Sequence, residues 1–179
     1  MSELRTSRLR LRHWREADLA LFAALNADPL VMEFLGPCLS RGESDALARR
    51  AEDALARRGF GFWALEVHES GLFAGFVGLS VPGFAAHFTP CVEVGWRLSH
   101  AAWGKGYASE AARACLEFGF RELALRQIVA FTARANRRSR AVMERLGMRY
   151  DPADDFEHPR LSPADPLRAH VLYRIDAGA

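Results

Sequence analysis

One stretch of the chain decides its fold: residues 92–108 read VEVGWRLSHAAWGKGYA. Apolar residues dominate 92–98, as in a buried strand, and helical periodicity follows residue 104. Between them, Gly104 and Gly106 flank Lys105. Glycine lets the backbone approach a ligand closely, and the first N–H groups of a helix have no partner within the helix. The stretch therefore predicts a strand, a short loop and a helix N-terminus that can bind an anion such as a phosphate.

Lys105 adds a full positive charge to this site and is the only lysine in a chain with 24 Lys and Arg residues. Other glycine-loop interpretations fit less well. A P-loop needs Ser or Thr directly after Gly-Lys, whereas Gly106 follows here. A dinucleotide-binding fingerprint needs a third Gly or Ala at a set offset, and a nucleophile elbow would need Gly in place of Pro82. A simple loop-to-helix turn stays open as an alternative.

Outward from this stretch, strand and helix patterns alternate along the chain. The expected strands are 9–14, 60–67, 72–81, 92–98, 128–133 and 170–175. The expected helices are 16–25, a short one that ends near 34, one that the pair Ser40 and Glu43 caps and that runs to Arg58, and then 105–122 and 137–146. Residues 150–168 hold four of the eight prolines and are expected to form an ordered loop. This order predicts a mixed α/β fold with helices on the faces of one sheet.

Composition fits one domain that spans residues 1–179. Half of the residues are hydrophobic, and a net charge of +2 does not indicate a nucleic-acid-binding protein. No apolar run is long enough to predict a membrane span, and no signal-peptide pattern is found, so we expect a cytoplasmic protein. Cys38, Cys91 and Cys115 lack zinc-site spacing, so we expect free thiols and no metal.

Three motifs carry a resemblance to a known family. They are TSRLRLR at 6–12, WGKGYA at 103–108, and NRRS at 136–139 with VMERLGM at 142–148. The WGKGYA motif resembles the pyrophosphate loop of the GNAT acetyltransferases, and the residues from 136 to 148 resemble the latter half of their fold. The TSRLRLR motif resembles the opening of the RimJ/RimL-type branch, which includes N-terminal acetyltransferases of ribosomal proteins. The resemblance covers nearly the whole chain, to about Arg174.

The resemblance implies a mixed, mostly antiparallel sheet that is splayed between its fourth and fifth strands, with helices on both faces. The pantetheine arm of acetyl-coenzyme A, the expected co-substrate, would lie in that gap. Trp96 and Leu98 would offer backbone groups to the arm, and Asn136 would face it from the end of the fifth strand.

The resemblance also implies where the phosphates bind. The pyrophosphate would lie against Trp103, Gly104, Lys105, Gly106, Tyr107 and Ala108. Trp103 is a departure, because the family loop usually begins with Gln or Arg, so one side-chain contact to phosphate is expected to be missing. Arg137, Arg138 or Arg140 could reach the adenosine 3′-phosphate, and a solvated helix face is the alternative for each of them.

Acetyl transfer to an amine needs a base, because the amine is mostly protonated at neutral pH. Glu93 is the candidate base, acting through water, since a carboxylate is out of place in the middle of an apolar strand. An ordinary solvent-facing position is an equally good interpretation. The leaving thiolate needs a proton, and the RimJ/RimL-type resemblance implies Ser139 as its donor, with Tyr173 as a weaker alternative. A first-turn serine bonded to the backbone is the alternative for Ser139.

The sequence therefore favours an acetyl-CoA-dependent N-acetyltransferase that acts by direct attack in a ternary complex. The acceptor would be a protein N-terminus or a small amine, and the enzyme a monomer or homodimer with no nucleic-acid or membrane partner. Phe34, Phe60, Phe62 and Trp63 could line the acceptor cleft, although most of them suit a core better. A non-catalytic acyl-CoA sensor would show the same loop without needing Glu93.

Overall fold

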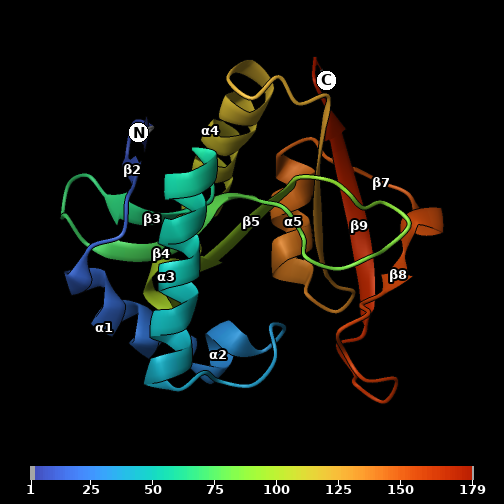
Figure 1. Cartoon of the computed structure of the whole chain (residues 1–179), viewed down its shortest axis with the longest axis horizontal. Coiled ribbons are helices and arrows are strands. Elements are labelled where there is room, and N and C mark those ends of the chain that lie inside the picture. Colours follow the sequence, from blue (N-terminus) through green and yellow to red (C-terminus); the bar gives the residue numbers. More distant parts are fainter. Residues whose placement is uncertain (1–2, 179) are drawn as a thin grey trace.

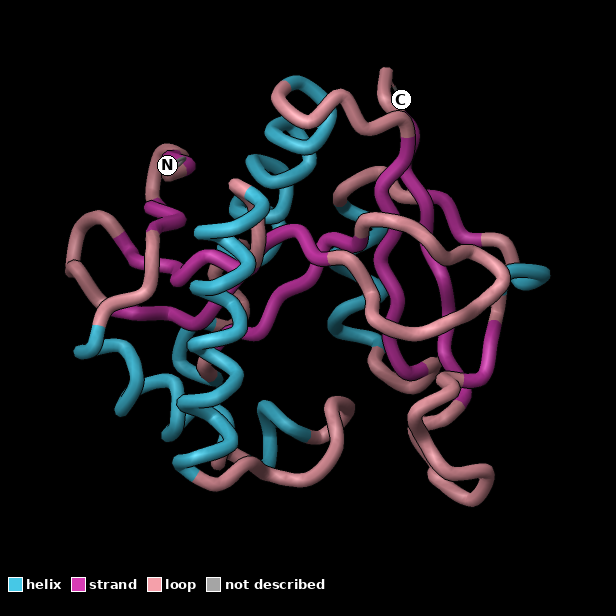
Figure 2. Tube along the Cα trace, in the orientation of Figure 1, coloured by secondary structure: helices cyan, strands magenta, loops and turns pink. Residues whose placement is uncertain are grey.

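A single mixed sheet runs through the computed structural model, which describes residues 3–178 (Figures 1 and 2). Within these residues the strand order is β1-β2-β3-β4-β5-β6-β9-β7, and β8 pairs with β9. The strands are β1 Leu4–Arg5, β2 Leu9–Arg12, β3 Phe62–Val67, β4 Phe73–Ser80, β5 Glu93–Leu98, β6 Gln127–Ala133, β7 Arg149–Tyr150, β8 Phe156–Glu157 and β9 Ala169–Asp176. The helices are α1 Glu16–Asn26, α2 Pro29–Met32, α3 Arg41–Arg58, α4 Tyr107–Arg121 and α5 Arg137–Arg145, with 3₁₀ turns η1 His100–Ala102 and η2 Pro152–Asp154.

The sheet is antiparallel except between β5 and β6, where it parts. These two parallel strands share one register pair, Glu93 with Val129, and Val129 N donates to Val92 O at 3.0 Å. Figure 1 shows β3, β4 and β5 on one side of the molecule and β7, β8 and β9 on the other. The predicted splay is confirmed. The predicted fourth and fifth strands are β5 and β6, because the short β1 precedes the first predicted strand.

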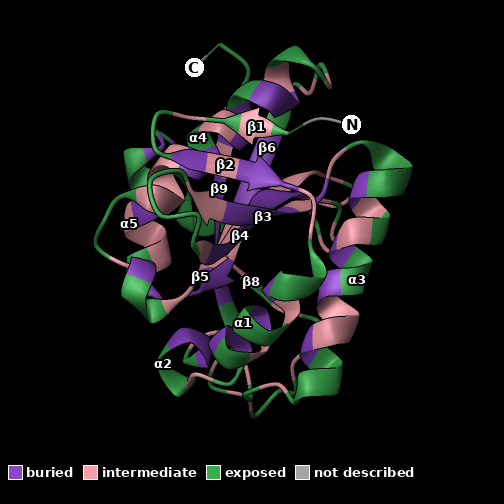
Figure 3. Ribbon diagram, turned by 90° about the vertical axis from the view of Figure 1, so that its left-hand side faces the viewer, coloured by how far each residue is buried: buried purple, intermediate pink, exposed green. Residues whose placement is uncertain are grey.

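Helices cover both faces of the sheet, as predicted. On one face, α4 and α5 complete the larger core, in which Cys115 packs with Val77. On the opposite face, Phe22 of α1 and Ala48 of α3 pack with Phe76. Phe76 and Val77 belong to different clusters because successive strand residues point to opposite faces. In Figure 3 the strands are mostly buried, whereas α3 carries both buried and exposed residues.

Local signals place the ends of α3 as predicted. Ser40 Oγ accepts a hydrogen bond from Glu43 N at 3.4 Å, and Glu43 Oε2 accepts one from Ser40 N at 2.7 Å. At the other end, Gly59 adopts a left-handed φ of 74°. Only glycine takes this backbone conformation without a steric cost, which explains why the helix stops there.

The remaining differences from the sequence-based prediction are short. The predicted loop 150–168 contains η2 and β8, and β7 ends within it; these pieces are too short to show a hydrophobic period. The predicted helix 105–122 begins at Tyr107, since Gly106 has a φ of +79° that a helix cannot hold. The second short helix ends at Met32 rather than Phe34. None of the helices in the described part of the chain combines the length and apolarity needed to cross a membrane.

Candidate active site

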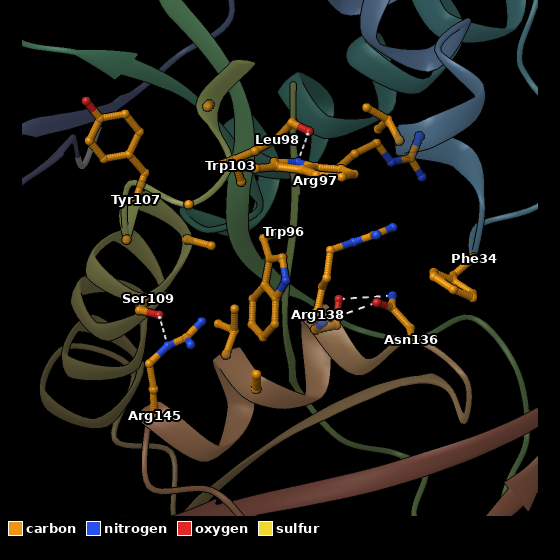
Figure 4. A pocket seen from close by; sticks show the side chains of 18 of the residues that line it. Phe34, Trp96, Arg97, Leu98, Trp103, Tyr107, Ser109, Asn136, Arg138 and Arg145 are labelled. Atoms are coloured by element: carbon orange, nitrogen blue, oxygen red, sulfur yellow. Dashed lines mark hydrogen bonds between the residues drawn. The ribbon is translucent and has the colours of Figure 1, made fainter. Parts of the chain in front are cut away.

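A cavity of about 550 Å³ opens where the end of β5 meets the start of α4 and the face of α5. Four segments contribute to its lining, namely 31–35, 96–98, 102–109 and 136–145. Figure 4 shows Trp96 in the middle, with Tyr107 and Arg145 to one side and Phe34 to the other. The cavity draws on the end of β5 and on the helix that follows β6, so it lies where these two strands have parted.

The start of α4 presents unpaired backbone donors to this cavity. Gly104 and Gly106 have φ values of +72° and +79°, and no side chain caps the helix. Among the described residues, no hydrogen bond is donated by the amides of 104–108. Such amides, together with the helix dipole, favour an anion. The predicted anion site is therefore open to a ligand rather than satisfied by the protein itself.

The one acidic residue in the first turn of α4 is turned away from the amides. Glu110 accepts hydrogen bonds from Thr6, Ser7 and Arg8, including Arg8 Nε at 2.7 Å. Arg8 also donates from Nη1 to Lys105 O at 3.0 Å and lies over the ring of Tyr107. The 6–12 segment thus holds the glycine loop in place and neutralises the carboxylate nearest to it.

Every charged residue that lines the cavity is an arginine: Arg97, Arg138 and Arg145. Arg145 Nε donates to Ser109 Oγ at 3.3 Å, so Arg145 lies beside the first turn of α4. Arg138 pairs with Glu33 at 2.6 Å, and its guanidinium carbon lies 4.5 Å from the centre of the Trp103 ring. Lys105 is exposed and does not line the cavity. The cavity is therefore cationic, which suits a ligand with several phosphates.

The backbone of β5 has free positions along the gap. The carbonyl of Val92 accepts a hydrogen bond from β6. Because backbone groups point to alternate sides along a strand, the N–H and C=O groups of Trp96 and Leu98 also point toward β6. β6 has no register pair with β5 beyond Glu93. The carbonyl of Leu98 accepts the indole Nε1–H of Trp103 at 3.0 Å. A carbonyl has two lone pairs, so this bond leaves room for a second donor.

Asn136 and Ser139 form one hydrogen-bonded unit at the start of α5. Asn136 Oδ1 accepts from Ser139 N at 3.2 Å, which caps the helix. Asn136 Nδ2 donates to Thr132 Oγ1 at 3.0 Å and to Ser139 Oγ at 3.1 Å. Ser139 Oγ donates to no acceptor among residues 3–178, and Ser139 lines the cavity. Its hydroxyl proton is therefore available to a ligand.

Glu93 begins β5 on the face opposite to that of Val94, and it pairs in register with Ser80 of β4 and Val129 of β6. Its side chain is partly buried, and it lies outside the lining of the cavity. Burial away from water raises the pKa of Glu93 from 4.5 to about 7, although a hydrogen bond with Ser80 acts in the opposite direction and lowers it. A carboxylate with a pKa near neutrality can exchange protons at physiological pH.

Known proteins resemble this chain in sequence and in fold. The family model of the acetyltransferase (GNAT) domain matches residues 8–149. The chain belongs to the GNAT acetyltransferases. YkkB of Bacillus subtilis (strain 168) is 33% identical over 150 residues, which are 83% of this chain and 86% of YkkB. The crystal structure of an acetyltransferase from Agrobacterium tumefaciens str. C58 has a TM-score of 0.77 at 28% identity, covering 98% of this chain and 94% of that one.

The GNAT fold is shared with ribosomal-protein acetyltransferases. RimL, a ribosomal L7/L12 alpha-N-protein acetyltransferase solved in complex with coenzyme A, has a TM-score of 0.77 at 16% identity, with 98% of each chain covered. An identity this low shows the common fold. The predicted GNAT membership is confirmed, and RimL is among its structural neighbours, as the RimJ/RimL-type resemblance implied. Acetyl transfer from acetyl-CoA is the activity of this family.

Within this GNAT acetyltransferase, most of the predicted cofactor residues meet in the cavity. Those that line it are Trp96, Leu98, Trp103, Gly104, Gly106, Tyr107, Ala108 and Asn136, and the predicted proton donor Ser139 lines it too. Arg137 is exposed at the start of α5 and does not line it. Arg140 lies outside the lining too, because it donates to Tyr173 OH at 3.3 Å and to Arg134 O at 3.3 Å. Tyr173 is buried and donates to Glu144 at 3.1 Å, so it packs α5 against β9.

Two arginines of the cavity escaped the sequence-based prediction. Arg145 lies seven residues after Arg138 and hence on the same face of α5, a spacing that helical periodicity could have revealed. No local pattern in the sequence could have identified Arg97, because it is held by a hydrogen bond to Asn26 of α1, which is distant in sequence. Phe34, one of the candidates for the acceptor cleft, lines the cavity, whereas Trp63 is fully buried in the core. Among residues 3–178, no group of three His, Cys, Asp or Glu side chains is placed to hold a metal ion.

Proposed function

We propose that this chain, as one acyltransferase domain over residues 1–179, moves the acetyl group of acetyl-CoA to a primary amine by direct attack while both substrates are bound. The observation that carries the proposal is the row of unpaired amides at 104–108 beside the parted strands β5 and β6. An anion-binding helix end next to a gap in the sheet suits a diphosphate that is attached to a slender arm.

The residues present fit acetyl-CoA. The amides of 104–108 and the guanidinium of Arg145 would hold the diphosphate, and the backbone of Trp96 and Leu98 would hold the arm. Arg137 and Arg140, which lie outside the lining of the cavity, remain candidates for the adenosine 3′-phosphate. Acetyl-CoA supplies an activated thioester, so the protein needs no covalent intermediate of its own.

The proton transfers are assigned to two side chains. Glu93, with a pKa of about 7, takes a proton from the acceptor ammonium through water, since only the neutral amine can attack. Ser139, whose hydroxyl proton has no acceptor among the described residues, donates a hydrogen bond to the sulfur that leaves. Both assignments are separable from binding, because neither side chain is needed to hold the phosphates.

The acceptor is a small amine or a protein N-terminus. The name of RimL, an alpha-N-protein acetyltransferase, makes the second a natural first test. We propose a cytoplasmic enzyme, monomeric or dimeric, that requires no metal.

The test measures thiol release from acetyl-CoA with and without an amine library, and identifies the product by mass spectrometry. The proposal expects amine-dependent release and a product that is heavier by one acetyl group. A protein that binds acetyl-CoA but releases no thiol with any amine would be an acyl-CoA sensor instead. Ser139→Ala should slow release and leave acetyl-CoA binding unchanged, and Ser162→Ala, in an exposed loop, is the matched control.

A further inference from the structure

Arg97 lines the cavity, and its guanidinium has no acidic partner among the described residues. Its one hydrogen bond within residues 3–178 runs from Nη1 to Asn26 Oδ1, at 2.7 Å. Its Nε is buried without any acceptor, and no Asp or Glu of the described chain forms an ion pair with it. One side of the group lies 5.5 Å from the centre of the Phe76 ring.

This arrangement is unusual for a half-buried charge. A guanidinium removed from water is costly unless it is paired and hydrogen-bonded. Burial lowers the pKa of Arg97 to about 10, so the group still carries its charge at neutral pH. Asn26 cannot compensate that charge, because it is neutral and its own Nδ2 is bound to Ser44 Oγ at 2.8 Å.

Arg12, the buried arginine among residues 3–178, shows the usual solution. Arg12 binds both carboxylate oxygens of Asp18, at 2.7 and 2.8 Å, and binds Glu66 at 2.6 Å. Arg138, at the mouth of the same cavity, is paired with Glu33. Among these three arginines, Arg97 alone forms no ion pair, and it lines the cavity.

The Arg97 end of the cavity differs from the phosphate end. Trp96 and Leu98 pack with the α4 side of the sheet, and strand alternation directs Arg97 to the α1 side, where Asn26 lies. Figure 4 shows Tyr107, Ser109 and Arg145 on the opposite side of the cavity from Phe34. A diphosphate bound at α4 would therefore not neutralise the charge of Arg97.

The residues that line the cavity near Arg97 indicate the chemical class of its ligand. Val31, Phe34 and Leu35 line this part of the cavity from α2 and the residues after it. No carboxylate lines any part of the cavity. A small anionic group on an otherwise apolar or neutral molecule matches one planar guanidinium within such walls, and a carboxylate matches it best because two parallel N–H donors can bind its two oxygens.

Resting on the acetyl transfer proposed above, we propose that the acceptor is a primary amine that also carries a carboxylate, and that Arg97 binds this carboxylate. The carboxylate could belong to a free amino acid or to an acidic side chain near the start of a peptide. Arg97 is then a specificity-determining residue. It orients the acceptor and takes no part in the proton transfers.

The experiment compares matched acceptors at saturating acetyl-CoA. One arm pairs free amino acids with their carboxamides, and the other pairs peptides that begin Ala-Asp with peptides that begin Ala-Asn. We expect kcat/KM to favour the carboxylate member by about tenfold or more in one arm, from the strength of a charge-assisted hydrogen bond. Arg97→Met should abolish this preference, mainly through KM, and Arg97→Lys should keep part of it. Arg50→Met, an exposed arginine of α3, is the matched control and should change neither.

Several results would overturn the inference. Equal kcat/KM within every pair, or a preference that survives in Arg97→Met, would remove the role of Arg97. A preference of the wild-type protein for succinyl-CoA over acetyl-CoA, lost in Arg97→Met, would assign the carboxylate to the donor instead. If no amine is acetylated, the proposed function fails first. In that case, calorimetric titration of the same paired amines into the complex of the protein with coenzyme A tests the inference. Equal affinity for the two members of each pair would refute it.

The Arg97→Met variant must also be shown to fold. Its dissociation constant for acetyl-CoA should equal that of the wild type, because the phosphate end is untouched. If Arg97→Met does not fold, Arg97→Lys is used in its place. A preference for the carboxylate acceptor as large as that of the wild type would then contradict a bidentate contact, because lysine cannot form one.

Discussion

Arg8 and Glu110 are joined across 102 positions of sequence, with Arg8 Nη2 2.6 Å and Nε 2.7 Å from Glu110 Oε2. This pair brings the start of the chain to the first turn of α4. It also neutralises the one carboxylate that could repel an anion at the amides of 104–108. The 6–12 segment therefore supports the proposed donor site without lining the cavity.

Loss of this neutralisation should weaken acetyl-CoA binding. In Arg8→Ala, Glu110 loses its ion-pair partner beside the phosphate site, and we expect the dissociation constant to rise by about two- to fivefold at low salt. Calorimetry with acetyl-CoA at two ionic strengths measures it. Arg10→Ala, which removes a partly exposed arginine that pairs with Glu3, should leave the affinity unchanged. An equal effect of the two variants would point to general surface charge.

Backbone conformation at Gly104 is the second test of the donor site. Gly104→Ala forces a side chain into a φ of +72°, at a cost of about 1–2 kcal/mol, and we expect at least a severalfold loss of acetyl-CoA affinity as the loop rearranges. Gly59→Ala is a matched control, because its φ is +74° and no atom lies within 4 Å of the new methyl group in either case. Both variants should lose similar stability in urea, whereas only Gly104→Ala should bind acetyl-CoA less tightly. Unchanged binding in Gly104→Ala would count against the site.

The role of Glu93 predicts a pH-dependent rate. Since the base must be ionised, kcat should rise with pH through about 7. Glu93→Gln should reduce kcat by about 10²-fold or more and remove that limb, with little change in acetyl-CoA affinity. Glu117→Gln, on the exposed side of α4, serves as the control. A Glu93→Gln enzyme with full kcat and the same pH profile would eliminate Glu93 as the base.

The same carboxyl group predicts a pH-dependent stability. The pKa of Glu93 is raised from 4.5 to about 7 in the folded protein, so its contribution to stability is complete below about pH 4.5 and is lost as the pH rises through 7. The loss is at most about 3 kcal/mol. Urea denaturation of wild type and Glu93→Gln from pH 4 to pH 8 should therefore show the variant gaining relative stability toward high pH. Parallel curves would mean that the carboxyl group is not desolvated.

The buried pair of Arg12 and Asp18 predicts a large effect on stability. Asp18→Ala leaves the guanidinium of Arg12 with only Glu66 as an acidic partner, and removing one partner of a buried pair costs about 3–5 kcal/mol. Asp45→Ala breaks an exposed pair with Arg41 and should cost about 0.5 kcal/mol or less. Urea midpoints of the two variants give the comparison. A similar small loss in both would show that Arg12 and Asp18 are solvated.

Much of the fold could be predicted because its signals are local. The capping box of Ser40 and Glu43, the stop at Gly59 and the glycine loop before α4 depend on residues that are close in sequence. The two-residue strands β1, β7 and β8 could not be predicted, since pairing with β2 or β9 is all that makes them strands. The sequence also could not show which arginines of α5 line the cavity, because this depends on where the helix packs.

The pattern of glycine, lysine and apolar residues at 92–108 was enough to predict a strand, a helix N-terminus and free backbone amides between them, because these properties follow from backbone geometry over a few residues. The environment of each side chain was decided by the tertiary structure. Glu93 has a pKa near 7 because folding strips it of water beside Ser80, and Arg97 lacks an acid because α1 presents Asn26 to it. Desolvation and charge pairing are set by neighbours in space, and these come from segments that are far apart in the chain.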